Sequence, residues 1–258
     1  MKNLVGIITD LGAMTLFLSD IIKVFINKKL KRKEIFVQIW KVTEDSFPTT
    51  AMAGFFVGAI LTVQFALQLQ EFSALGFLGG LATSGTFREV GPLLIAFMLS
   101  GKVGAFTSAE LGTMRVTEQI DAIRCLGADP IQEIVLPRFI AIIISSFFLL
   151  GLGLLMSVFG GMLMGYAFAG VNFEEYLRHI PTILSPISIA SGLIKCLTFA
   201  FILATVCSYK GYTTSGGAKG VGRAVVSTAV TTMVAIVIFD WMTSFAGDIL
   251  LEWIRGYR

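Results

Sequence analysis

The sequence contains little charge, one histidine and no paired cysteines. Only 14% of its 258 residues are charged and 55% are hydrophobic, whereas a soluble domain averages about 25% charged residues. His179 has no second histidine or cysteine cluster with which to bind zinc, and the three cysteines form no CxxC pair. We therefore expect no catalytic residues, metal site, cofactor or disulfide framework. The net charge of +3 gives no reason to expect a nucleic acid partner.

A phosphate-binding loop for ATP is also missing from the sequence. The pattern GxxxxGK[ST] fails at Gly101-Lys102, because Val103 follows and Ala96 stands where the first glycine is needed. We therefore expect no enzyme activity of this chain. The energy for any transport must come from a partner or from an ion gradient.

Two stretches without charge, residues 46–70 and 139–173, are 25 and 35 residues long. A bilayer core of ~30 Å requires about 20 apolar residues in a helix. We therefore expect an all-α membrane protein with about five transmembrane helices, at roughly 47–70, 85–108, 139–169, 187–208 and 225–247. Pro48 is expected to open the first span. The third span is long enough to project past the outer side of the bilayer or to bend near Gly151 and Gly153.

Lysine and arginine are unevenly distributed over the connecting segments. Fourteen lie in the N-terminal segment and in the connections 109–138 and 209–224, against three in 71–84, in 170–186 and at the C-terminal end. Cytoplasmic loops carry the excess of these residues. We therefore expect a multi-pass protein with a cytoplasmic N-terminus.

The N-terminal segment has a different pattern from the spans. Residues 4–30 repeat apolar side chains every three or four positions, and a basic block occupies 28–33. This pattern is typical of an amphipathic helix in the cytoplasmic membrane interface, its basic end drawn to anionic headgroups. A sixth span is the alternative. The chain thus divides into an N-terminal segment (1–45), a membrane domain (46–250) and a tail (251–258).

Small residues recur at every fourth position in three of the predicted spans. Small residues at i and i+4 let helices in lipid approach closely. The rows indicate packing within the chain or, for at least one row, the seam of a homodimer. The candidate packing residues are Gly54, Gly58, Ser100, Gly104, Ser108, Gly161 and Gly165.

Among the charged residues inside predicted spans are Arg88 and Glu89 in the second and Lys195 midway along the fourth. A charge at the bilayer centre costs about 2.5–3.5 kcal/mol on insertion scales, so these side chains should face a cavity or a partner charge. Arg88 or Lys195 would suit a lipid phosphate. The alternatives are a structural pair of Glu89 with Lys195 or with Arg88, or a Lys195 that snorkels to the cytoplasm.

Other polar residues in the spans are less informative. Gln64 and Gln68 form a polar stripe on the first span, which suits either a lipid pocket or a helix–helix contact. Asp240 and Asp248 lie near the outer end of the last span, where we expect them at the membrane interface.

The connection after the second span predicts a helix of about 17 residues over 110–126, outside the membrane. Arg115/Glu118 and Asp121/Arg124 form i, i+3 pairs, and Met114, Val116, Ile120 and Ile123 give the helix an apolar side. It suits docking in a groove of a cytoplasmic protein, or alternatively a position on the membrane surface. The residues predicted for this coupling helix are Glu110, Met114, Arg115, Glu118, Gln119, Asp121 and Arg124.

Several of these motifs together resemble the MlaE permease family, the membrane subunits of Mce-associated ABC transporters. The resemblance covers about residues 45–250 and is most specific at 86–138. The position of Lys102 departs from the family pattern, where arginine is expected. The matching motifs are Gly54-xxx-Gly58-xxxxx-Gln64, Arg88-Glu89-Val-Gly91-Pro92, Ser100-Gly-Lys-Val-Gly104, Ala109-Glu110 through Gln119-Ile-Asp121-Ala, Asp129-Pro130 and Pro137-Arg138.

The resemblance implies a homodimer in the bacterial inner membrane with a phospholipid pocket at the dimer interface, here assigned Gln64, Arg88, Glu89 and Lys195. It further implies a separate cytoplasmic ABC ATPase docked on the 110–126 helix and an Mce-domain protein on the outer face. The main rival is an ion-gradient-coupled carrier of a hydrophobic substrate that uses Glu89, Lys195 or Asp240, although no internal repeat typical of such carriers is evident. For a second rival, a membrane enzyme that acts on lipids, His179 and its neighbours are the only candidate catalytic residues.

Overall fold

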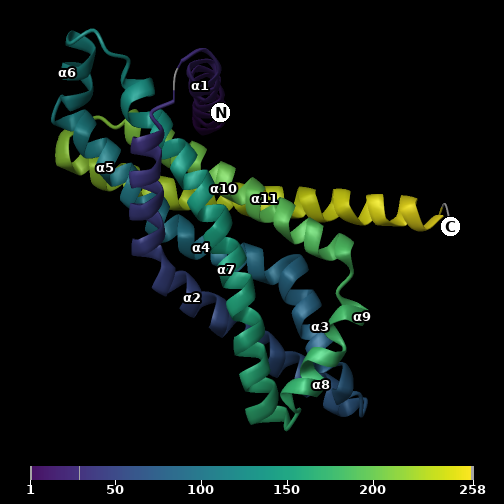
Figure 1. Ribbon diagram of the computed structural model, residues 1–258. Coiled ribbons are helices and arrows are strands. Elements are labelled where there is room, and N and C mark those ends of the chain that lie inside the picture. The colour runs from purple at the N-terminus through teal and green to yellow at the C-terminus, as the bar shows by residue number, and fades with distance from the viewer. Residues whose placement is uncertain (1, 29, 257–258) are drawn as a thin grey trace. The chain divides into compact units, whose positions relative to one another are not determined.

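The computed structural model describes residues 2–28 and 30–256, and all regular secondary structure in these ranges is helical (Figure 1). Five helical stretches are long and apolar enough to cross a membrane, which confirms an all-α protein with five candidate spans. They are Arg32–Glu71, Leu75–Val116, Ile131–Ala169, Pro186–Tyr212 and Gly217–Gly247.

The helices are preceded by an N-terminal helix and joined by short ones. In chain order they are α1 (Lys2–Asn27), α2 (Arg32–Glu71), η1 (Leu75–Phe77), α3 (Leu78–Gly85), η2 (Thr86–Val90), α4 (Gly91–Leu99), η3 (Ser100–Gly104), α5 (Ala105–Val116), α6 (Gln119–Cys125), η4 (Ile131–Val135), α7 (Leu136–Ala169), α8 (Phe173–Arg178), α9 (Ile180–Ile183), α10 (Pro186–Tyr212) and α11 (Gly217–Gly256).

The first span begins earlier than its sequence predicts. Pro48 lies inside the 40-residue helix α2 and does not open it. Proline has no N–H for the carbonyl four residues earlier, here that of Glu44. The hydroxyls of Thr49 and Thr50 bond the helix backbone nearby, since both donate to the Ser46 carbonyl, at 3.0 and 2.8 Å. The expectation for Pro48 was therefore wrong.

Three π-helical turns, η2, η3 and η4, interrupt the regular helices. Two of them come just before a proline, Pro92 and Pro137. A proline has no N–H for the carbonyl four residues earlier and clashes with it, so a wider turn at that place relieves both problems. π-Turns inside helices occur often at functional sites, and η2 contains Arg88 and Glu89.

The chain forms two compact units, and each helix crossing from one to the other contributes to both. The first comprises 1–44, 100–145 and 200–234, and the second 45–99, 146–199 and 235–258. We describe each unit by itself.

In the second unit, glycines allow α2 and α7 to pack backbone to backbone. A Cβ at Gly54 would collide with the backbone of Gly153, and one at Gly58 with the backbone of Ser157. Nearby, the buried ring of Tyr176 from α8 fills the space beside Gly161, and its hydroxyl lies 3.1 Å from that of Thr62. Gly165 packs against the same ring. These rows of small residues therefore make contacts within the chain.

In the first unit, α1 packs against η4 and against the end of α10. Phe17 and Ile21 of α1 are buried, whereas Leu16 and Ile26 are exposed. Gly104 on the second span packs against Leu203 and Thr228, and Ser100 and Ser108 are buried. An N-terminal helix with two different faces is thus present, and its place in the membrane interface stays a prediction.

The α2–α7 contact predicts opposite effects for two glycines. We expect Gly58→Ala to destabilise the protein by about 1–3 kcal/mol, the usual cost of overpacking, because the methyl group meets the backbone of Ser157. Gly151→Ala on α7 is the control, since a Cβ there meets nothing within 4 Å and alanine favours the helix. Thermal unfolding in detergent micelles measures both, and equal midpoints for the two variants would contradict this packing.

Candidate functional site

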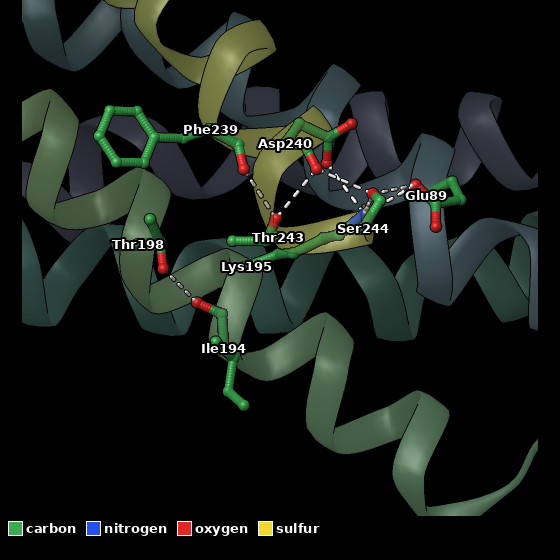
Figure 2. A network of polar contacts seen from close by, with 8 residues as sticks. All are labelled: Glu89, Ile194, Lys195, Thr198, Phe239, Asp240, Thr243 and Ser244. Atoms are coloured by element: carbon green, nitrogen blue, oxygen red, sulfur yellow. Dashed lines mark hydrogen bonds and ion pairs between the residues drawn. The ribbon is translucent and has the colours of Figure 1, made fainter. Parts of the chain in front are cut away.

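A buried lysine joins three helical segments of the second unit. The Lys195 side chain on α10 is 1% exposed, and its Nζ donates to Oε2 of Glu89 and to Oγ of Ser244, each at 2.7 Å (Figure 2). Oδ1 of Asp240 lies 3.0 Å from the same nitrogen without hydrogen-bond alignment. One ammonium group therefore faces two carboxylates and a hydroxyl.

Local sequence places these groups. Asp240 and Ser244 are four residues apart on α11 and so share one helix face. The Ser244 hydroxyl lies 2.8 Å from the Asp240 carbonyl and 2.9 Å from Oε2 of Glu89, and Glu89 comes from the π-turn η2. The hydroxyl therefore contacts the Glu89 carboxylate and the backbone of its own helix beside the lysine.

The network selects among the alternatives that the sequence left open. The Glu89–Lys195 pair is present, and Lys195 is buried with its charge paired inside the protein. The expectation for Asp240 was wrong: its side chain is 16% exposed and pairs with Lys195, because a buried cation in an apolar region requires a buried anion. The side chain of Asp248 lies outside the described part of the chain. The spacing Asp240-xxx-Ser244 in an otherwise apolar helix was the available signal.

A pocket of about 310 Å³ opens beside this network between η2, α10 and α11. Glu89 and Ser244 belong both to the network and to the pocket wall, and Arg88 lines the pocket as well. Its wall combines apolar side chains with hydroxyls and charges, namely Ile187, Ile194, Ser188, Ser191, Thr243, Arg88 and Glu89. Such a lining suits an amphiphilic ligand with a polar head and a short apolar part.

Gln64 does not join this pocket. It lies with Gln68 in a separate groove of about 600 Å³, formed by α2 and by Met164 of α7. The other lining residues are apolar, among them Phe55, Phe56 and Leu67. The structure therefore brings Arg88, Glu89 and Lys195 together and leaves Gln64 on a different surface.

The predicted coupling helix is two helices and not one. α5 ends at Val116, Glu118 has a left-handed backbone with φ +60°, and α6 begins at Gln119. As a consequence Arg115 pairs with Asp121 at 2.6 Å and not with Glu118, whereas the expected Asp121–Arg124 pair is present at 3.4 Å. A left-handed glutamate has no clear sequence signal, because this conformation favours Gly, Asn or Asp.

The apolar side of the 110–126 region packs inward. Ile120 is buried against Leu111 and Ile134, and Met114 and Ile123 lie partly buried on this cluster. The same unit therefore covers much of this side, and docking of the 110–126 region on a partner stays a prediction. The tip of the segment instead exposes Glu118, Gln119 and Leu126, the last at 85%.

Glu110 also points into the unit. Its carboxylate lies 3.1 Å from Nζ of Lys41 on α2 and 3.4 Å from Nη2 of Arg138 on α7. Arg138 donates in addition to the Ile134 carbonyl at 3.2 Å. Glu110 thereby ties α5 to α2 and α7. It supports residues 117–135, which we call the coupling segment after their predicted role, without being at the tip of that segment.

Five apolar spans and a charge network buried within them define a multi-pass membrane protein with a polar site between its helices. The family model of Permease MlaE matches residues 35–246. A probable ABC transporter permease protein of Rickettsia conorii is 37% identical over 241 residues, which cover 93% of each chain. The chain therefore belongs to the MlaE permease family, which confirms the resemblance carried by its motifs.

More distant relatives agree with this assignment. A probable ABC transporter permease protein of Synechocystis sp. is 34% identical over 218 residues, covering 84% of this chain and 82% of the relative. The protein TRIGALACTOSYLDIACYLGLYCEROL 1, chloroplastic, of Arabidopsis thaliana is 32% identical over 219 residues, covering 84% of this chain and 62% of the relative.

The buried network predicts a large effect for its lysine. Lys195→Met should destabilise the protein by about 3–5 kcal/mol, because it leaves the carboxylate of Asp240 buried without a cation. The double variant Lys195→Met with Asp240→Asn should recover a large part of this loss. Unfolding in detergent micelles measures the difference. Thr198→Val, one turn along α10 on a partly exposed position outside the network, is the control and should change stability by less than about 0.5 kcal/mol.

Proposed function

We propose that this chain is the permease subunit of an ABC transporter that moves phospholipid or a related lipid. It works between the bacterial inner membrane and an Mce-protein assembly on the outer face, and a separate cytoplasmic ATPase drives it. The observation that carries this proposal is the amphiphilic pocket beside the Lys195 network, in a chain of the MlaE permease family.

The chemistry of the pocket supports a lipid as its ligand. Arg88 offers donors to a phosphate, the Ser188 hydroxyl offers a further polar contact, and Ile187 and Ile194 offer apolar contacts. The Gln64 groove is mostly apolar and would hold acyl chain. The name of the Arabidopsis relative contains that of a glycerolipid, which favours this ligand class.

The coupling segment supports the ATPase as a partner. Its tip exposes the apolar side chain of Leu126 and the charge of Glu118. Such a tip suits insertion into a groove on the surface of the ATPase. Arg115, Asp121 and Arg124 fix the shape of α6 behind the tip. In this scheme ATP binding moves the tip, and Glu110 passes the displacement to α2 and α7 through Lys41 and Arg138.

The remaining parts of the proposal concern assembly. We place the N-terminus in the cytoplasm, in agreement with the excess of Lys and Arg in that segment. α11 carries an exposed apolar stripe, and the span that it forms, Gly217–Gly247, is the least buried of the five. We propose this stripe as the seam of the homodimer. Within the second unit, the stripe comprises Val237, Trp241 and Phe245.

The buried ionisable network also favours a second candidate, an ion-coupled carrier, because intramembrane acids and lysines serve as ion sites in such proteins. Reconstitution distinguishes the two. The proposal requires lipid movement that depends on the ATPase partner and ATP. Movement by the purified chain alone, driven by a proton or sodium gradient, would establish the carrier instead.

Lipid binding is tested at Arg88. Arg88→Gln should lower the phospholipid that co-purifies with the protein by about tenfold, the size expected for losing one charge-assisted hydrogen bond of about 1.5 kcal/mol. Mass spectrometry of detergent-purified protein gives the amount of lipid per chain. Arg178→Gln, an exposed arginine on α8 outside the pocket, is the matched control. Equal phospholipid in both variants would remove Arg88 from the binding site.

ATPase docking is tested at the tip. Glu118→Lys combined with Leu126→Asp should abolish co-purification of the ATPase subunit, because both side chains are exposed and neither supports the fold of α6. Membrane insertion should be unchanged. Phe72→Asp is the control, since Phe72 is equally exposed but follows the first span, on the other side of the membrane. A normal yield of ATPase with the tip variant would refute docking at this place.

A further inference from the structure

The basic block after α1 binds acidic residues of this chain. Nζ of Lys28 lies 2.9 Å from Oδ2 of Asp129, and Lys31 forms a second ion pair with Glu133. Burial alone would raise the pKa of Asp129, but hydrogen bonds from Lys28 and from the Ile131 amide hold it below the ordinary value. Two cations that the sequence assigns to lipid headgroups therefore hold the residues that follow α6.

The body of α1 holds the end of α10 in the same unit. The buried ring of Phe17 lies 5.3 Å from the ring of Tyr212 and 5.8 Å from that of Tyr209, measured between centroids. Asp10 forms an ion pair with Lys210 at 2.9 Å. An apolar contact and a charged one thus fix α1 to the last turns of α10.

Tyr212 extends this contact to α6. Its hydroxyl accepts a hydrogen bond from Nη2 of Arg124 at 2.6 Å, and the guanidinium lies 6.0 Å above its ring. The ring also packs on the Leu111, Ile120 and Ile134 cluster that supports α6. Tyr212 therefore touches α1 with one part of its ring and α6 with its hydroxyl.

Two contacts at the C-terminal end of α6 thus lead to α1. Arg124 bonds Tyr212, whose ring packs on Phe17 of α1, and Asp129 pairs with Lys28, the residue directly after α1. We propose that α1 is a clamp that sets the position of the coupling segment, and that Tyr212 is the positioning residue that connects this clamp to α6. A displacement of α6 then has to carry α1 with it or break these contacts. The role in coupling rests on the proposed function, whereas the clamp itself does not.

An N-terminal helix that only anchored the chain to the membrane would behave differently. Its exposed apolar residues, such as Leu16 and Ile26, suit an anchor, but an anchor has no need of ion pairs to Asp129 and Glu133. If α1 is only an anchor, changes in these contacts leave α6 unaffected. If α1 is a clamp, they loosen α6 from a distance.

The first experiment is hydrogen–deuterium exchange of the purified full chain in nanodiscs. Tyr212→Phe removes the acceptor of Arg124 and keeps the ring on Phe17, so amide exchange in 119–126 should rise by about three- to tenfold, as expected for one partly exposed charge-assisted hydrogen bond. Tyr209→Phe is the matched control, because the Tyr209 hydroxyl makes no hydrogen bond within the described residues. Equal exchange in the two variants overturns the role of Tyr212.

The second experiment tests the clamp by charge reversal at Lys28, because Asp129 also accepts the Ile131 amide and a change there would disturb the loop directly. Lys28→Glu should raise exchange both in 119–126 and in α1, because it places two anions side by side, whereas Lys28→Arg keeps the ion pair and should leave exchange unchanged. Unchanged exchange in 119–126 for Lys28→Glu overturns the clamp.

The same variants separate this inference from the proposed function. Exchange is measured without the ATPase, so it tests the clamp even if no ATPase binds. In the complex, Tyr212→Phe should lower lipid-stimulated ATP hydrolysis at least threefold while the amount of bound ATPase stays the same. Wild-type protein that binds no ATPase refutes the proposed function only, and unchanged hydrolysis in a complex of the Tyr212→Phe variant refutes the coupling role of the clamp.

Discussion

The ammonium group of Lys195 constrains the second unit more than any other group. A lysine without contact to water in an apolar region must either lose its proton or keep anions beside it. Glu89 and Asp240 supply these anions from η2 and α11, so three segments distant in the sequence have to meet at one atom. The pocket lies beside this meeting point, and Glu89 and Ser244 belong to both the charge network and the pocket wall.

Close backbone packing sets the second constraint. α2 and α7 contact each other through Gly54, Gly58 and Gly160, where any side chain would meet backbone atoms. In lipid, helices gain little from apolar burial and associate through such close contact. The exposed faces that remain are apolar, with Phe56 and Leu67 beside Gln64 and Gln68. Two amides in an apolar groove indicate a surface that meets a ligand or a second chain, because lipid tails offer them no hydrogen bonds.

Much of this fold can be predicted from the sequence, because bilayer thickness and uncharged runs determine where the spans lie. The Glu89–Lys195 pair could also be predicted from the sequence, because an unpaired charge inside a membrane raises the free energy of the protein. The break at Glu118, the π-turns and the partners of Asp121 were not, because they depend on local backbone geometry that composition does not encode. Asp240 was misplaced because hydropathy locates a residue along a span, but does not show whether its side chain points to lipid or to a neighbouring helix.

Charge outside the spans follows a different logic from charge inside them. Positive residues in cytoplasmic loops orient a membrane protein. Here Lys28 and Lys31 also pair with acidic residues of the coupling segment, and Lys41 pairs with Glu110. Exposed pairs of this kind contribute little stability one by one, so their number in one place argues for positioning. A segment that has to transmit movement needs defined contacts on both sides, and in this unit α1, α2 and α10 provide them. The lysines from which the orientation of the chain is predicted thus also hold Asp129, Glu133 and Glu110.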